Sequence, residues 1–186
     1  MTKKEIIILI TTHLCMLLGG TIIFVSLFHT KLFSYINVFF YRGIALLIFA
    51  CMFTTVIEIY IKRKNYISDF TYRDIILSVS VLFSFCLVVF THLPVTADRS
   101  VSVFILGYMN THSDKSFTQN DLTDILTEVY IDENTAIDKR LKEQTISGNV
   151  TTDGDRYQIS KQGKLIMDFY IKVADLFNVD KKNLSK

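Results

Sequence analysis

Hydrophobic residues are concentrated in three long runs in the first half of the chain. The runs cover residues 6–28, 43–61 and 75–95, and charged residues hardly interrupt them. A helix of about 20 residues crosses the ~30 Å hydrocarbon core of a bilayer, so each run is long enough to span it. At this length only a helix satisfies every backbone hydrogen bond without water. The pattern therefore predicts three transmembrane helices within residues 1–98.

Short amphipathic segments replace the long runs after Arg99. Thr118 is the expected N-cap of a helix, with Asp121 at the capping-box position. Gly148 is a typical helix terminator, and the Asp-Gly-Asp sequence that starts at Asp153 is typical of a hairpin turn. The pattern predicts helices over 100–112, 116–131 and 133–149, a hairpin over 149–160 and a final helix over 161–179. One face of the final helix carries Leu165, Phe169, Val173 and Leu176.

This order of elements resembles the winged-helix domains of MarR- and PadR-type regulators. The resemblance covers Ser100 to about Val179. It rests on TQNDLTDIL as the second helix, on TAIDKRLKEQTISGNV as the recognition helix and entry to the wing, and on DGDRYQISKQGKLI as the wing and return. It implies a small α+β domain over residues 99–186. Winged helices bind DNA in some proteins and only other proteins in others.

The only proline of the sequence, Pro94, lies where the two halves meet. Because proline lacks an N–H and its ring clashes with the preceding turn, we expect the third transmembrane helix to end there. Thr96 or Asp98 would then cap the next helix.

The basic residues that flank the runs predict an orientation. The N-terminus and the second loop together hold Lys3, Lys4, Lys62, Arg63, Lys64 and Arg73, whereas the first loop holds Lys31 and Arg42. Basic flanks remain cytoplasmic. The N-terminus is therefore expected in the cytoplasm, and three crossings place residues 99–186 outside it.

Polar residues within membrane helices are costly and merit inspection. We expect Glu58 and His92 at the membrane interfaces, where water reaches them, and His13 against another helix. Gly19 and Gly20 would let helices approach closely. The candidate contacts for a lipid phosphate or a partner, all near the outer interface, are His29, Arg42, His92 and Arg99.

The charge of the polar half bears on nucleic-acid binding. Lys139, Arg140 and Lys142 are the candidate contacts of a recognition helix. A reader of duplex DNA needs clustered cations that face phosphates. From residue 112 onward, however, thirteen acidic residues outnumber eleven basic ones. Nucleic acid is therefore not the favoured partner.

Few residues of the sequence indicate a disulfide or a catalytic, metal or cofactor site. Cys15, Cys51 and Cys86 all lie in apolar runs, which does not indicate a disulfide framework. No metal- or nucleotide-binding motif is present, so no catalytic residue, cofactor or metal is assigned. The sequence favours a non-enzymatic membrane protein whose winged-helix-like domain binds a protein partner or itself, as an accessory or scaffold subunit. The alternatives are a membrane-tethered winged-helix transcription regulator and a small membrane enzyme, or accessory subunit of one, for lipid-linked phosphates or glycans.

Overall fold

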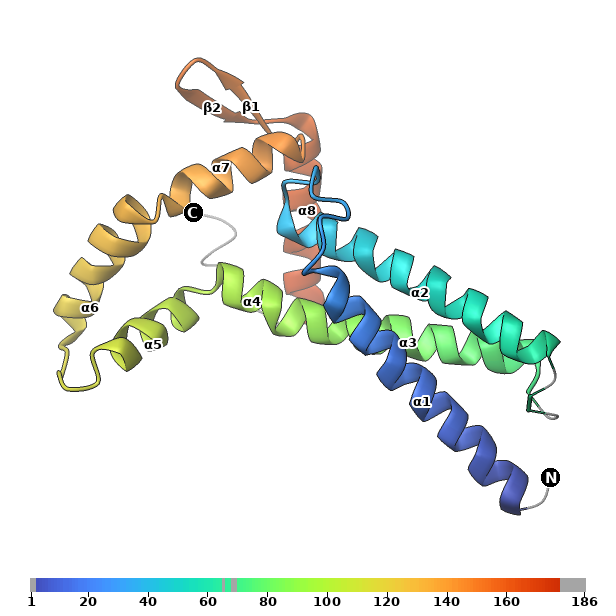
Figure 1. The fold of residues 1–186 in the computed structure, drawn as a ribbon. Coiled ribbons are helices and arrows are strands. Elements are labelled where there is room, and N and C mark those ends of the chain that lie inside the picture. Colours follow the sequence, from blue (N-terminus) through green and yellow to red (C-terminus); the bar gives the residue numbers. More distant parts are fainter. Residues whose placement is uncertain (1–2, 65, 68–69, 178–186) are drawn as a thin grey trace. The chain divides into compact units, whose positions relative to one another are not determined.

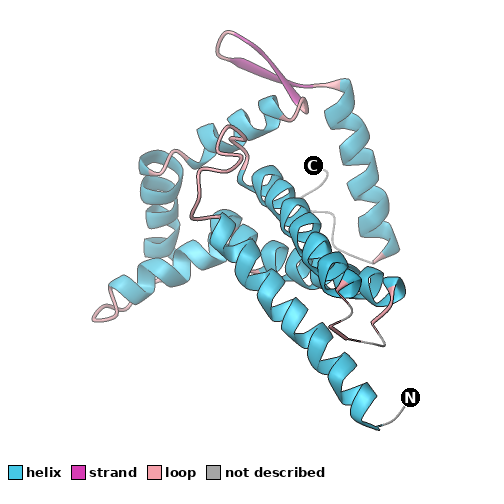
Figure 2. Ribbon diagram, turned by 45° about the vertical axis from the view of Figure 1, so that its right-hand side comes forward, coloured by secondary structure: helices cyan, strands magenta, loops and turns pink. Residues whose placement is uncertain are grey.

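A computed structural model describes residues 3–64, 66–67 and 70–177. The chain divides into two compact units, residues 1–104 and 105–186. Helices form most of the described chain, and the one sheet among the described residues has two strands (Figure 2).

The first unit is a bundle of three long helices. They are α1 (Lys3–Leu27), α2 (Phe39–Arg63) and α3 (Tyr72–His92), followed by the short α4 (Pro94–Arg99) (Figure 1). Each of the three long helices packs against the other two. Three segments are long and apolar enough to cross a membrane, namely Ile6–Phe28, Phe39–Arg63 and Tyr72–Arg99. The predicted number of such helices is confirmed.

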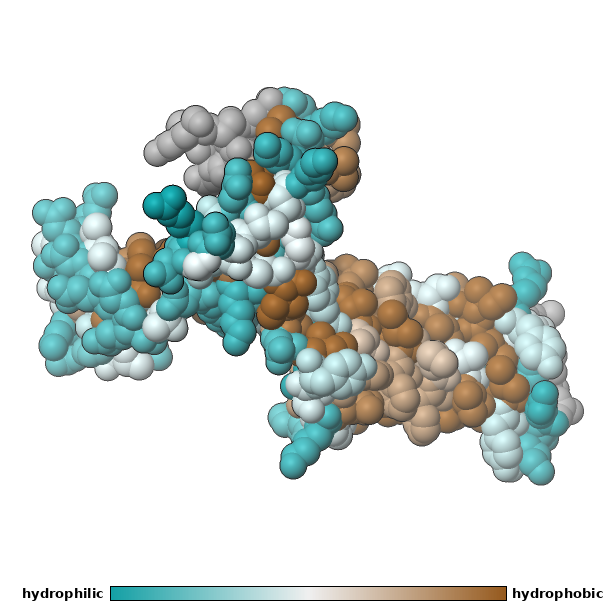
Figure 3. All heavy atoms as spheres, turned by 90° about the horizontal axis from the view of Figure 1, so that it is seen from above, coloured by the Kyte–Doolittle hydropathy of each residue, from teal (hydrophilic) through white to brown (hydrophobic). Residues whose placement is uncertain are grey.

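The outer surface of the bundle is hydrophobic. Ile22 on α1, Val56 on α2 and Ile76 on α3 are each 65–67% exposed. Figure 3 shows this surface as a hydrophobic body between hydrophilic ends. An exposed apolar area of this extent needs a cover, and the length of the helices matches that of a bilayer core.

Aromatic rings form the centre of the bundle at the end where α1 and α3 finish. Phe90 of α3 is 1% exposed, and its ring centroid lies 5.6–6.3 Å from four other rings, those of Phe24, Phe28, Phe39 and Phe40. Gly43 makes this packing possible, since a Cβ atom there would lie 2.0 Å from Cζ of Phe90. Of the two glycines expected to allow close approach, Gly20 does so against Leu82, whereas Gly19 faces open space.

The expected end of the third helix at Pro94 is confirmed, because α3 ends at His92. Only Leu93 interrupts the helix, and Pro94 occupies the first position of α4. Its missing N–H costs nothing there, because the first N–H groups of a helix have no helical partner. The expected caps Thr96 and Asp98 lie inside α4. A second break comes after α4 at Ser100, which is extended and whose hydroxyl accepts a hydrogen bond from the Val103 N–H at 3.3 Å.

The second unit contains the expected order of helices and strands. The helix α5 (Val101–Thr111) begins just before it. The elements that follow are α6 (Gln119–Ile125), the π-helix η1 (Leu126–Glu133), α7 (Ala136–Ile146), β1 (Val150–Asp153), β2 (Arg156–Ile159) and α8 (Lys161–Leu176). The strands pair antiparallel, from Val150 with Ile159 to Asp153 with Arg156. Asn178 and Val179, which end the predicted final helix, lie outside the described residues.

The capping box at the start of α6 is confirmed. The Thr118 N–H donates to Oδ2 of Asp121 at 2.8 Å, and the Asp121 N–H donates to the Thr118 hydroxyl at 3.2 Å. The Thr118 N–H and then the Thr118 side chain, which both interact with the Asp121 carboxylate, hold the pKa of Asp121 below its usual value. The π-helix that follows was not expected. It ends before Thr135, whose φ of 49° lies in the left-handed region.

A close backbone contact joins the first turn of α8 to the start of the hairpin. The Ser160 hydroxyl accepts from the Gly163 N–H at 3.0 Å and donates to the Gly148 carbonyl at 2.7 Å. A Cβ atom at position 163 would lie 2.2 Å from the carbonyl oxygen of Asn149. Glycine is therefore required at this point, and it fixes where α8 begins.

Replacing Gly43 with alanine tests the packing of the bundle. We expect Gly43→Ala to lower the free energy of unfolding by about 1–3 kcal/mol, the usual cost of overpacking a core. The matched control is Gly19→Ala, which adds the same methyl group to open space and should be neutral or stabilising by up to about 1 kcal/mol. Thermal unfolding of the full chain in detergent measures both, and equal effects of the two variants would contradict the packing described.

Candidate functional site

The four candidate contacts expected near the outer interface have different surroundings in the structure. Arg42 Nη2 donates to the carbonyl of Thr30 at 2.8 Å, and this bond fastens the first loop to α2. His92 is exposed and its Nδ1 donates to the Val88 carbonyl of its own helix at 2.9 Å. Arg99 is exposed on α4 and interacts within the chain. His29 follows α1 and lines a pocket. The first three therefore have structural partners within the chain.

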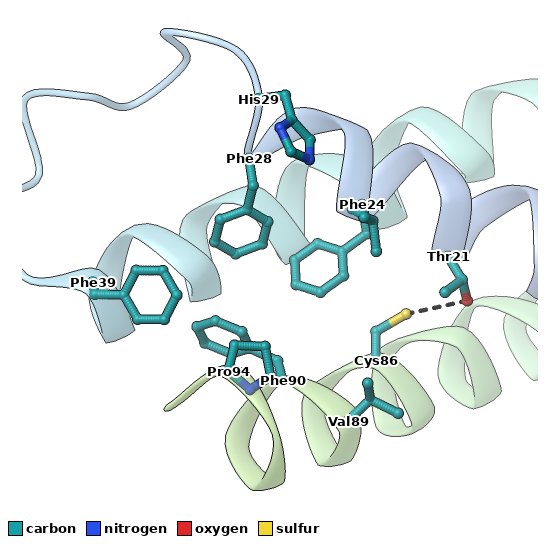
Figure 4. A pocket seen from close by; sticks show the side chains of 10 residues that line it. Thr21, Phe24, Phe28, His29, Phe39, Cys86, Val89, Phe90 and Pro94 are labelled. Atoms are coloured by element: carbon teal, nitrogen blue, oxygen red, sulfur yellow. Dashed lines mark hydrogen bonds between the residues drawn. The ribbon is translucent and has the colours of Figure 1, made fainter. Parts of the chain in front are cut away.

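The pocket beside His29 is almost entirely apolar. It has a volume of about 240 Å³ and lies between the ends of α1 and α3 and the start of α2 (Figure 4). Its lining is dominated by aromatic rings, those of Phe24, Phe28, Phe39 and Phe90, together with Pro94. The polar atoms of Thr21 and Cys86 lie 3.5 Å apart and interact with each other. Such a pocket suits an apolar group, for instance part of a lipid chain, and offers no arrangement for acid–base or nucleophilic catalysis.

The candidate recognition residues lie on α7 in different surroundings. Arg140 Nη1 donates to Oε2 of Glu143 at 2.9 Å, and Glu143 is 7% exposed. Lys139 also interacts within the chain, whereas Lys142 is exposed. The guanidinium of Arg140 thus neutralises a buried carboxylate of its own helix. This ion pair competes with any contact between the Arg140 guanidinium and a DNA phosphate.

The most conspicuous surface of the second unit is an apolar stripe on α8, formed by Leu165, Phe169 and Leu176. These three side chains are 71%, 62% and 78% exposed. At about 100° per residue they lie within roughly 40° of one another around the helix. The sequence pattern identified this face. It could not show that the described chain leaves the face uncovered.

The opposite side of α8 is the side that packs. Gly163 and Ala174 are buried there, and Met167 and Ile171 are half-buried. The helix therefore carries apolar side chains both on the side that packs within its unit and on the side that stays exposed. Tyr170 and Phe177, at 52% and 71% exposure, widen the uncovered surface. An uncovered apolar surface on a small domain is typical of an interaction site.

Glu58 differs most from its sequence-based expectation. It was expected at the membrane interface, but the structure buries it completely among the three long helices, at 0% exposure. His13, expected to face another helix, does so and contacts Ser78 and Asp74 of α3.

Comparison of the chain with known protein families, curated proteins and solved structures finds no match.

The pairing on α7 predicts unequal effects of its basic residues. Arg140→Gln should lower the free energy of unfolding of the second unit by about 1–3 kcal/mol, because it leaves the buried Glu143 carboxylate without its charged donor. Lys142→Gln, a change of the same kind at an exposed position, should alter it by no more than about 0.5 kcal/mol. Chemical denaturation monitored by circular dichroism measures both. A larger loss from Lys142→Gln would contradict the assigned pairing.

Proposed function

We propose that this chain is an integral membrane protein whose second unit binds a protein partner at the membrane surface, as an accessory or scaffold subunit. The first unit is the anchor. The second is a winged-helix-like domain used for protein interaction, with α8 as its binding surface. The observation that carries the proposal is the exposed apolar stripe of Leu165, Phe169 and Leu176.

The energetics favour a partner on this stripe. Burying a large apolar side chain stabilises a complex by about 1.5–3 kcal/mol, and aromatic residues dominate the binding energy of many interfaces. Phe169 lies between Leu165 and Leu176 along the helix. The exposed rings of Tyr170 and Phe177 lie beside this stripe. A stripe with a central aromatic anchor suits a groove or helix on another protein.

The order α5, α6, α7, hairpin, α8 supports the winged-helix-like assignment. The bias of basic residues supports a cytoplasmic N-terminus and a second unit outside the cytoplasm. A DNA-binding regulator receives less support, because Arg140 pairs with Glu143 and the unit carries more acidic than basic residues.

Photo-crosslinking from α8 tests the proposal. With p-benzoylphenylalanine in place of Phe169, irradiation of native membranes should give a discrete protein adduct on an immunoblot, because the reactive ring lies in the interface. Two differently tagged copies identify a band that contains a second molecule of this chain. The control position is Lys164, which is exposed and lies about 140° around the helix from Phe169, and which should give no such adduct.

Two results would contradict the proposal. Adducts with lipid alone at position 169 would show that the stripe rests on the membrane. Equal protein adducts from positions 164 and 169 would show that contacts on α8 are nonspecific collisions.

A further inference from the structure

Four polar side chains meet inside the bundle near the end where α1 begins. His13 comes from α1, Glu58 from α2, and Asp74 and Ser78 from α3. At 1.5 Å per residue, His13 lies about 10 Å along its helix from Ile6, where the apolar segment starts. The group therefore lies within the membrane-spanning length of the bundle, where polar side chains are costly and commonly functional.

Glu58 lies deepest in this group and has no counter-charge among the described residues. It is 0% exposed, and neither of its carboxyl oxygens receives a hydrogen bond of ordinary geometry there. The Ser78 hydroxyl is the polar group that interacts with it. Lys62 lies one turn further along α2, but its Nζ donates to the Phe70 carbonyl at 3.0 Å and lies 4.7 Å from the centre of the Tyr72 ring. The nearest lysine of the helix is thus engaged elsewhere.

A row of polar contacts leads from the partly exposed edge of the bundle to Glu58. Asp74 Oδ1 lies 3.8 Å from His13 Nε2, and His13 Nδ1 lies 2.5 Å from the Ser78 hydroxyl. The side chains of Asp74 and His13 are 18% and 22% exposed. Ser78 is 6% exposed and Glu58 0%, so access to water falls from His13 inward to Glu58. Arg73 beside Asp74 is exposed, and the Phe70 ring covers His13 at 6.1 Å between ring centroids.

The bundle is closed beyond Glu58. Thr54, the next polar residue along that face of α2, uses its hydroxyl to donate to the Ala50 carbonyl at 2.9 Å. The core then continues through Leu46, Leu47, Ala50, Cys51, Leu82, Cys86 and Phe90. Among the described residues, the polar row therefore has one open end, on the side of the N-terminus.

We propose that Glu58 is a proton-binding site that is loaded and unloaded from the N-terminal end of the bundle by way of His13 and Ser78. A buried carboxylate without a counter-charge is strongly unfavourable, whereas the neutral acid is not. Nε2 of His13 is itself buried, so a proton from water at the bundle edge reaches it by way of the partly exposed Asp74 carboxylate, 3.8 Å away, and the proton on Nδ1 passes to Ser78 Oγ. The hydroxyl proton of Ser78 passes in turn to a carboxyl oxygen of Glu58. The net result is the transfer of one proton, and the reverse sequence returns it.

The single open end determines what such a site can do. A proton that reaches Glu58 leaves by the route through which it entered, since an apolar core follows. The site therefore responds to the pH on the N-terminal side and does not conduct protons across the bundle. A change of charge on Glu58 alters the interior of all three helices at once, because each contributes to the site.

Infrared difference spectroscopy of the full chain in lipid bilayers tests this inference. We expect a carbonyl band of a buried protonated carboxylic acid near neutral pH, and we expect Glu58→Gln to remove it. The control Asp121→Asn alters an exposed carboxyl of the second unit and should leave the band unchanged. Ser78→Ala should retain the band but slow its hydrogen–deuterium exchange by about 100-fold, a typical effect of removing a proton-transfer group.

Wild-type protein with ¹³C-labelled glutamate carboxyl groups assigns the band to a glutamate even where Glu58→Gln fails to fold, and persistence of the band in Glu143→Gln excludes the other glutamate that is buried among the described residues. The band must shift with this label. A band that persists in Glu58→Gln, or that does not shift with the label, would overturn the proposal. So would loss of the band when sodium chloride replaces choline chloride, because Glu58 would then bind a metal cation as a carboxylate.

Discussion

The packing of Phe90 against Gly43 holds the first unit together. A single ring from α3 reaches the backbone of α2 and contacts aromatic rings from both other helices. In a membrane, apolar burial from water contributes little to helix association, so close van der Waals packing of this kind must supply it. The same ring forms a wall of the apolar pocket and ends the core that closes the bundle beyond Glu58. Both features depend on its position.

The two ends of the bundle differ in their chemistry. The end with Phe90 is aromatic and apolar, and its pocket offers shape and apolar surface. The other end contains His13, Glu58 and Ser78. Polar side chains within a membrane are energetically costly and commonly functional. The three helices therefore combine a rigid packing end with an end that can change its charge. The second unit adds the uncovered apolar stripe of α8, which is the surface that we propose for a partner.

Sequence reasoning succeeded where one physical property dominates. Long runs without charge gave the three apolar helices, and the spacing of Thr118 and Asp121 gave a capping box that the structure contains. It failed at the caps Thr96 and Asp98, which lie inside α4, because the proline that follows one helix also occupies the first position of the next. It also placed Glu58 at an interface from its distance to the helix end. Burial of the Glu58 side chain depends on how α1 and α3 pack against α2, and a hydropathy profile carries no information about that packing.

If three helices cross the membrane, the two ends of the chain lie on opposite sides, because the number of crossings is odd. Epitope tags at the N- and C-termini, probed with impermeant antibodies in intact and permeabilised cells, measure this directly. We expect one tag to be accessible in intact cells and both after permeabilisation, with the C-terminal tag outside. Equal accessibility of both tags in intact cells would contradict it.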